Sequence, residues 1–259
     1  IRLGADVFGH QRISSIKCDQ LLEAMHGFRH ILSAYRVVDY RACATSAMRE
    51  AANGAELMAQ ISEVGIDLEI ISGYEEADII FKTGIAQMID SNKDYLYVDV
   101  GGGSTEVTVV KKGEKVGQES FRIGTVRMLN NQTSNEEIER YKKFMRTQAT
   151  HLKDASLIGS GGNINTLFKL MNKKYGESIL PTELKQMFDY LNRFTFDERV
   201  EVLRLHPHRS DVIIPATQIF MWAFKYSNSK RIFVPKMGLS DGIAQQLYYK
   251  YREKQKAEL

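Results

Sequence analysis

The chain has 259 residues, of which 43% are hydrophobic and 26% charged, with a formal net charge of +3 at pH 7. This length allows two domains with substantial cores, and the composition is typical of a globular protein. No apolar stretch approaches the ~18 residues of a membrane span, and the charge is too small to predict a nucleic-acid partner. The start of the sequence has no signal-peptide pattern, so we expect no signal peptide.

The two cysteines, Cys18 and Cys43, show neither a disulfide framework nor the spacing of a zinc site. This cysteine usage favours a reducing cytoplasm. We therefore expect a cytoplasmic protein with neither a nucleic-acid nor a membrane partner.

The first part of the chain alternates between helical and strand patterns. Apolar residues at helical spacing predict a helix over residues 18–35. A strand is expected over 37–44, followed by a helix with Thr45 at its N-cap. Another strand over 66–71 turns at Ser72-Gly73-Tyr74 into a helix that begins with Glu75 and Glu76.

Residues 95–110 predict a strand–turn–strand hairpin, because β-branched and aromatic residues flank a glycine-rich turn. Glycines have no Cβ, so the amide N–H groups of this turn can converge on an anion. The turn comprises Gly101, Gly102, Gly103, Ser104 and Thr105. The alternative is an ordinary hairpin tip, but short tips rarely need three consecutive glycines.

The second part of the chain continues the alternation. We expect a strand at 118–122, a helix at 135–152, a strand at 156–158, helices at 196–204 and 211–226 and a strand at 231–234. A final helix should follow, with a charged tail at 252–259 that is solvated or frayed. Thr195 and Glu198 predict a capping box. The pattern predicts an α/β fold with mostly parallel strand pairing and a domain junction near residues 84–94.

Asp99 and Glu106 stand at the two ends of the glycine-rich turn and are candidate Mg²⁺ ligands. Asp99 ends an apolar strand, where an unpaired carboxylate would be costly, so we expect a metal or N–H groups beside it. Glu106 has two alternatives: it could hold the attacking water, or it could be a plain strand residue facing solvent.

Glu76 follows a turn after a strand, where α/β folds present side chains to ligands. Alternatively, Glu75 and Glu76 are first-turn acids stabilised by the helix dipole. Arg49 is the candidate for contacting a phosphoryl oxygen, since guanidinium matches phosphate bidentately; the alternative is that it faces water. The case for Arg127 is weaker.

A second glycine-rich segment, Gly159–Asn163, follows a strand and begins a helix, which is a plausible phosphate or nucleotide contact. Gly161, Gly162 and Asn163 are its candidate ligand-binding residues. The dinucleotide-binding fingerprint does not fit, because Ile164 occupies the third glycine position and no acidic strand end follows about 20 residues later.

Together these segments resemble the exopolyphosphatase and guanosine pentaphosphate phosphatase family, a branch of the actin, heat-shock ATPase and sugar-kinase superfamily. The segments that carry the resemblance, in order, are 44–51, 71–77, 98–106, 122–128, 158–163 and 209–213. Any single motif is only moderately specific, whereas six in order are strong evidence.

The resemblance implies two actin-like (ribonuclease H-like) domains with a cleft between them, at 1–86 and 87–240, and a C-terminal helix at 241–259. It implies Glu76 as the general base and the segment from Asp99 to Glu106 as the phosphate and metal loop. Members of the family often form homodimers. The family's first phosphate loop, Asp-Xaa-Gly-Ser-Asn, has no match before Ser72. We therefore expect the N-terminal hairpin to be missing, which puts the activity of this chain in doubt.

The expected function is a metal-dependent phosphohydrolase that releases terminal phosphate from inorganic polyphosphate or guanosine pentaphosphate. The cofactor would be Mg²⁺ or another divalent cation. Two alternatives remain: a kinase of the same superfamily, and a non-catalytic sensor that binds a phosphorylated alarmone or nucleotide. The acids at positions 76, 99 and 106 argue against the sensor, since pure anion binders seldom place carboxylates beside the ligand.

Overall fold

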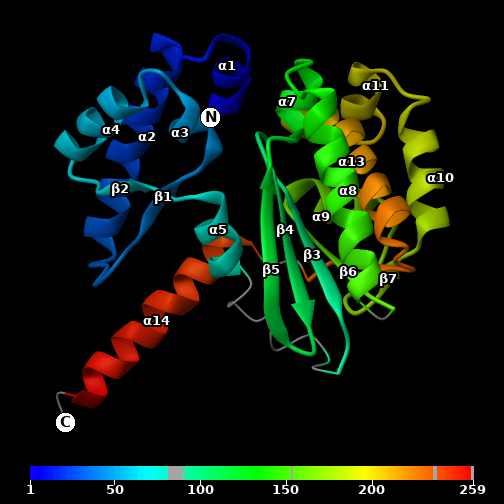
Figure 1. The fold of residues 1–259 in the computed structure, drawn as a ribbon. Helices are drawn as coiled ribbons and strands as arrows, with labels where there is room; N and C mark the ends of the chain where they lie inside the picture. The colour runs from blue at the N-terminus through cyan, green and yellow to red at the C-terminus, as the bar shows by residue number, and fades with distance from the viewer. Residues whose placement is uncertain (81–89, 91, 153, 236–237, 258–259) are drawn as a thin grey trace. The chain divides into compact units, whose positions relative to one another are not determined.

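The computed structural model describes residues 1–80, 90, 92–152, 154–235 and 238–257. The chain forms two compact units, Ile1–Thr83 with Leu239–Leu259, and Gly84–Gly238. Both units mix helices and strands (Figure 1), as expected for an α/β protein. The predicted junction at 84–94 lies largely outside the described residues. The domains predicted at 1–86, 87–240 and 241–259 remain a proposal.

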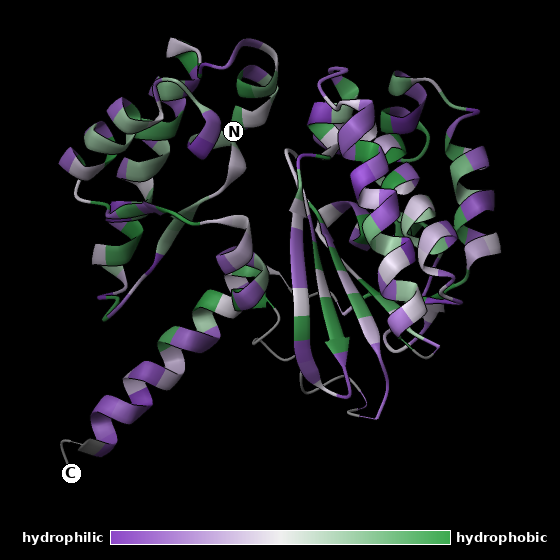
Figure 2. Ribbon diagram, viewed as in Figure 1, coloured by the Kyte–Doolittle hydropathy of each residue, from purple (hydrophilic) through white to green (hydrophobic). Residues whose placement is uncertain are grey.

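The first unit carries a small parallel sheet in which Ala42 pairs with Leu68 and Ala44 with Ile70. Its elements are α1 (Leu3–His10), α2 (Ser15–Ala34), β1 (Ala42–Ala44), α3 (Ser46–Glu50), α4 (Gly54–Glu63), β2 (Leu68–Ile70), α5 (Gly73–Ile80) and α14 (Leu239–Ala257). Helix α1 packs against α3, and α14 packs against α5. The later turns of α14 are predominantly hydrophilic (Figure 2).

One prediction for the first unit was wrong in its bounds. The strand expected over 37–44 is confined to Ala42–Ala44, because only those residues have a partner in β2. Thr45 is the N-cap residue of α3, as predicted, although its side chain makes no capping hydrogen bond. The charged tail from Arg252, expected to be solvated or frayed, is exposed over 252–256 and helical as far as Ala257.

The second unit is built on a six-stranded sheet with the order β5-β4-β3-β6-β8-β7. The strands are β3 (Tyr95–Val100), β4 (Thr105–Lys111), β5 (Glu114–Phe121), β6 (Ser156–Ser160), β7 (Ser178–Ile179) and β8 (Ile232–Phe233). The hairpin predicted at 95–110 is confirmed as β3 and β4. The ladder between β4 and β5 shifts register between Val109 and Val110.

The prediction of mostly parallel pairing was wrong for this sheet. Strand β3 pairs in parallel with β6, and β6 with β8. The pairs β3–β4, β4–β5 and β7–β8 are antiparallel. Short turns join β3 to β4 and β4 to β5, and such connections can join only antiparallel neighbours, whereas parallel pairs need a longer crossover.

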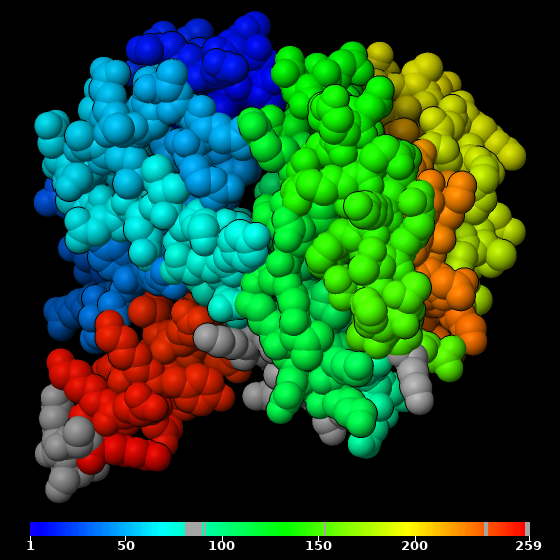
Figure 3. Space-filling view, in the orientation of Figure 1, coloured from blue at the N-terminus to red at the C-terminus, as the bar shows by residue number. Residues whose placement is uncertain are grey.

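Helices of the second unit bury one face of the sheet. They are α7 (Thr125–Leu129), α8 (Asn135–His151), α9 (Gly162–Leu170), α10 (Pro181–Leu191), α11 (Phe196–Glu201), α12 (Pro207–Ser210) and α13 (Ile213–Ser227). Helix α13 contacts α8, α10 and α9 as well as β3 and β6. The green surface of α8 borders the orange surface of α13 (Figure 3). The capping box of Thr195 and Glu198 at the start of α11 is confirmed.

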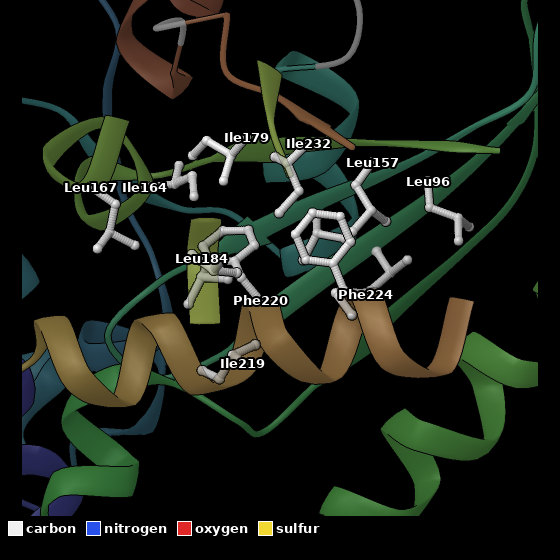
Figure 4. Packing of buried hydrophobic residues seen from close by; sticks show 14 of the residues in the cluster. Leu96, Leu157, Ile164, Leu167, Ile179, Leu184, Ile219, Phe220, Phe224 and Ile232 are labelled. Atoms are coloured by element: carbon white, nitrogen blue, oxygen red, sulfur yellow. The ribbon is translucent and has the colours of Figure 1, made fainter. Parts of the chain in front are cut away.

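The core of the second unit lies between α13 and the sheet (Figure 4). Phe220 and Phe224 project from α13 toward Leu157 and Ile232. Phe220, Leu157 and Ile232 are completely buried. The spacing of 220 and 224 places both rings on one helical face, so α13 is held mainly by apolar burial. No helix among the described residues is both long and apolar enough to cross a membrane.

Phe220→Ala should lower the free energy of unfolding of the second unit by about 3–5 kcal/mol, because it removes a fully buried ring and leaves a cavity. Phe196→Ala is the matched control, since that ring is 43% exposed, and it should cost less than about 1 kcal/mol. Urea unfolding followed by circular dichroism measures both. Equal losses would contradict the assignment of Phe220 to the core.

Candidate functional site

A row of polar side chains crosses four strands of the six-stranded sheet. The strand registers place Ser120 opposite Glu106, Glu106 opposite Asp99, and Asp99 opposite Ser160. Side chains at directly opposed positions lie on the same face of a sheet. The two carboxylates predicted as metal ligands are therefore neighbours on β3 and β4, at the carboxyl end of β3.

Both carboxylates are buried. Asp99 is 8% exposed and Glu106 2% exposed. The Ser120 hydroxyl donates a hydrogen bond of 2.9 Å to Glu106 Oε1. The Ser160 side chain and the Val100 amide hydrogen-bond to Asp99. The alternative in which Glu106 is a plain strand residue facing solvent is therefore wrong, because its side chain is buried.

Burial raises the pKa of Asp99 to about 6, against the opposing effect of the hydrogen bonds from Ser160 and Val100. An oxygen pair of this kind suits a hard divalent cation such as Mg²⁺, which usually takes only one or two protein carboxylates and completes its shell with water and phosphate. No group of three or more His, Cys, Asp or Glu side chains within the described ranges is arranged to hold a metal.

The glycine-rich turn has its carbonyl groups fixed by the segment that begins α7. The Gly101 oxygen accepts from the Thr125 amide at 3.0 Å, and the Gly102 oxygen from the Val126 amide at 2.9 Å. The Gly103 oxygen accepts from Arg127 Nε at 2.8 Å. Buried Arg127 therefore supports the turn through a carbonyl group.

The amide groups of the same turn are differently placed. Gly101 N–H donates to the Ser104 oxygen at 2.9 Å. Within the part of the chain that the structure describes, the N–H groups of Gly102, Gly103 and Ser104 donate no hydrogen bond to protein. In a trans peptide the N–H and C=O groups point in opposite directions, so anchored carbonyls leave these amides for an external acceptor.

Two glycines outside the turn are required by close approaches. A Cβ on Gly124 would lie 2.3 Å from the Gly102 oxygen. Gly161 has φ +103°, and a Cβ there would lie 2.8 Å from the Val100 oxygen and 3.3 Å from Asp99 Oδ1. Any side chain at Gly161 would be strained as well as crowded. The segment that begins α9 thus lies directly beside Asp99.

Arg209 lies beside Gly162 and Asn163, and no role was predicted for it from the sequence. A Cβ on Gly162 would lie 2.1 Å from its Nη2, and its Nη1 lies 3.4 Å from Asn163 Oδ1. Arg209 comes from α12, far from α9 in the sequence. The only sequence signal was its place in the segment 209–213 of the family pattern.

The site residues of the first unit lie near one another. Arg49 Nη1 donates 2.6 Å to the carbonyl oxygen of Ile71, just before the turn that begins α5. Glu76 lies in the first turn of α5, where its amide bonds to the Ser72 oxygen at 2.9 Å. Glu75 is exposed, as expected, and pairs with Arg41 at 2.6 Å.

Residues 1–250 match the model of the Ppx/GppA phosphatase family. The chain belongs to this family. The resemblance identified from the sequence is confirmed.

Curated relatives carry related names. The chain is 30% identical to a bifunctional 3-dehydroquinate synthase/phosphatase of Fusobacterium nucleatum, over 90% of this chain and 39% of that protein. It is 25% identical to exopolyphosphatase 2 of Mycobacterium tuberculosis, over 82% of this chain and 75% of that protein. It is 24% identical to a guanosine-5'-triphosphate,3'-diphosphate pyrophosphatase of Vibrio cholerae, over 98% of this chain and 54% of that protein. The chain thus spans between two fifths and three quarters of these relatives.

Solved structures of the family show the same fold. The Ppx/GppA family member of Aquifex aeolicus matches with a TM-score of 0.75 and 23% identity, over 96% of this chain and 87% of that one. An exopolyphosphatase from Cytophaga hutchinsonii matches with a TM-score of 0.77 and 24% identity, over 92% and 84%. The actin-like α/β fold class expected from the sequence is confirmed. A cytoplasmic location, a homodimer and the lack of nucleic-acid and membrane partners stay predictions.

Asp99→Asn should stabilise the cation-free protein at neutral and alkaline pH. Burial raises the folded-state pKa of Asp99 above its unfolded value. The contribution of protonated Asp99 to the stability of the wild-type protein is therefore fully present below about pH 4 and is lost as the pH rises through about 6. The amide stays neutral throughout. Its stability advantage should therefore grow by about 2 kcal/mol between roughly pH 4.5 and pH 8.

Thermal unfolding with a chelator present measures this advantage at both pH values. Asp197→Asn, at an exposed position in α11, is the matched control and should give a difference that does not change over this pH range. A pH-independent difference for Asp99→Asn as well would contradict the assignment of the raised pKa.

Proposed function

We propose that this protein is a metal-dependent phosphohydrolase that releases terminal phosphate from inorganic polyphosphate or guanosine pentaphosphate. The observation that carries the proposal is the turn with three amides that have no hydrogen-bond partner among the described residues, flanked by two buried carboxylates in direct register. The names of the Mycobacterium tuberculosis and Vibrio cholerae relatives agree with these two substrates.

In the second unit, the amides of Gly102, Gly103 and Ser104 would donate hydrogen bonds to the oxygens of the terminal phosphoryl group. The Thr105 hydroxyl donates 2.5 Å to the Ile123 oxygen, so this residue serves the shape of the turn. Gly161, Gly162 and Asn163 would bound the phosphate beside Asp99, with the Arg209 guanidinium against Gly162.

Asp99 and Glu106 would hold the divalent cation. When bound, the cation would neutralise charge on the phosphoryl oxygens and offset the cost of burying two carboxylates. Glu106 could also orient the attacking water, since its Oε1 is already fixed by Ser120. These roles are compatible with one another because a carboxylate has two oxygens.

In the first unit, Glu76 would take the proton from the attacking water and Arg49 would contact a phosphoryl oxygen. Phosphoryl transfer needs an in-line water and positive charge on the transferred group. The hydrogen bond from Arg49 to Ile71 fixes the exposed arginine next to the segment that begins α5. One nitrogen of its guanidinium is thereby engaged, and other N–H groups remain for a ligand.

Glu76→Gln should lower kcat by ~10²–10⁴, because an amide cannot accept the proton of the attacking water. Phosphate release from polyphosphate and from guanosine pentaphosphate, read with malachite green, measures the effect. Glu75→Gln is the matched control, since Glu75 makes an exposed ion pair with Arg41 and should retain near wild-type turnover. An unchanged rate for Glu76→Gln would remove Glu76 from the role of base.

Chelation should abolish phosphate release, and Mg²⁺ should restore it, because two adjacent carboxylates cannot bind a polyanion favourably without a cation. Asp99→Asn should require a higher Mg²⁺ concentration for half-maximal activity. A titration of Mg²⁺ against the initial rate measures this. Full activity with the chelator present would contradict the metal site.

The same assay separates the two alternative functions. A kinase of the superfamily would consume ATP only when an acceptor is present, and would release no phosphate from polyphosphate alone. A sensor would bind a phosphorylated nucleotide tightly without turnover. Steady phosphate release without an acceptor excludes both.

A further inference from the structure

A pocket of about 480 Å³ lies along helix α9. It is lined by Asn165, Lys169, Asn172 and Lys173. None of these residues was singled out by the sequence analysis, and none has a role in the site described above. The first two lie within α9, and the other two lie just beyond its end at Leu170.

The pocket lies along the helix that begins at Gly162, directly after Gly161. Residues four apart on a helix lie on the same face, so Gly161, Asn165 and Lys169 form one line along α9. The Asn165 amide donates to the Gly161 oxygen at 3.3 Å. Because Gly161 lies beside Asp99, this line starts at the proposed cation site and continues into the pocket.

The pocket carries a positive charge that the protein does not fully neutralise. Lys173 Nζ is paired with Glu183 Oε1 at 2.6 Å. Glu183 Oε2 also accepts from the Leu180 amide at 2.8 Å, which holds that carboxylate in place. Of the carboxylates that the structure describes, none lies within ion-pair distance of Lys169. Among the described residues, Lys169 is therefore a cation of the pocket without a carboxylate partner.

Asn165 provides a second observation. Its Oδ1 is buried and has no hydrogen-bond partner among the described residues. A buried acceptor without a donor is costly. Asn165 lines the pocket, so the described residues leave one polar side chain of the lining incompletely satisfied, as expected where a ligand or a bound water completes the contacts.

We propose that this pocket binds a second phosphate group of the substrate, remote from the phosphoryl group that is hydrolysed. The inference rests on the proposed function, because it takes the turn at Gly101–Ser104 as the place of the terminal phosphoryl group. Lys169 is seven residues after Gly162, which corresponds to about 10 Å along the helix. The second group is either a later unit of a polyphosphate chain or the 3'-diphosphate of guanosine pentaphosphate.

Lys169→Glu tests the proposal, with Lys174→Glu as the matched control. Lys174 is exposed and close in sequence, but it does not line the pocket. At low ionic strength we expect Lys169→Glu to raise KM at least about fivefold for long-chain polyphosphate or guanosine pentaphosphate, with a smaller fall in kcat. The rise should be smaller for tripolyphosphate, and Lys174→Glu should match wild type on all three.

The substrate whose KM rises identifies the source of the second phosphate group. Calorimetric titration of the same two ligands into the Glu76→Gln protein, with and without Lys169→Glu, gives a readout that does not need turnover. If Lys169→Glu abolishes binding but the wild-type protein releases no phosphate, the proposed function is contradicted and the assignment of the pocket is supported. If the Lys169 and Lys174 variants have identical KM values and identical binding for both ligands, the proposal that the pocket binds a second phosphate group is overturned.

Discussion

The structure depends on two carboxylates held opposite each other inside a sheet. Asp99 and Glu106 are register partners on β3 and β4, and both are nearly inaccessible to solvent. Two buried like charges repel and are poorly solvated, so this arrangement lowers the stability of the ligand-free chain. Serines at the flanking positions of the same row supply hydrogen bonds that offset only part of the cost. In the function proposed above, a cation and a polyanion would complete this site.

The second constraint is the orientation of the peptide groups in the glycine-rich turn. Carbonyl groups of the turn are bonded to the start of α7 and to Arg127, so the donors beside Asp99 are oriented before any ligand arrives. Such preorganisation avoids an entropy cost at the moment of binding. It also explains Gly124, whose missing side chain lets the segment before α7 approach the turn.

The sequence predicted what depends on neighbours along the chain. The hairpin at 95–111 has a strong local pattern, α8 starts at its predicted residue, and the capping box at Thr195 has the expected geometry. Strand directions, strand β7 and the partners of Arg209 depend on contacts between distant segments, and single-sequence patterns do not encode them. Likewise, the pairing of Glu106 with Ser120 follows from the β4–β5 register, which the turn residues alone do not determine.

The register shift between Val109 and Val110 has a consequence for association between molecules. It lies where β4 meets β5, the outermost strand of the sheet. An irregular ladder twists an edge away from the flat geometry that a foreign strand could extend. Arg140 of α8 also caps this margin, with its Nη2 on the Ser120 oxygen at 2.6 Å. The opposite margin is β7, with only two residues. The β7 margin is thus too short to template strand addition, whereas the eight-residue β5 margin is made a poorer template by its irregular ladder and by Arg140.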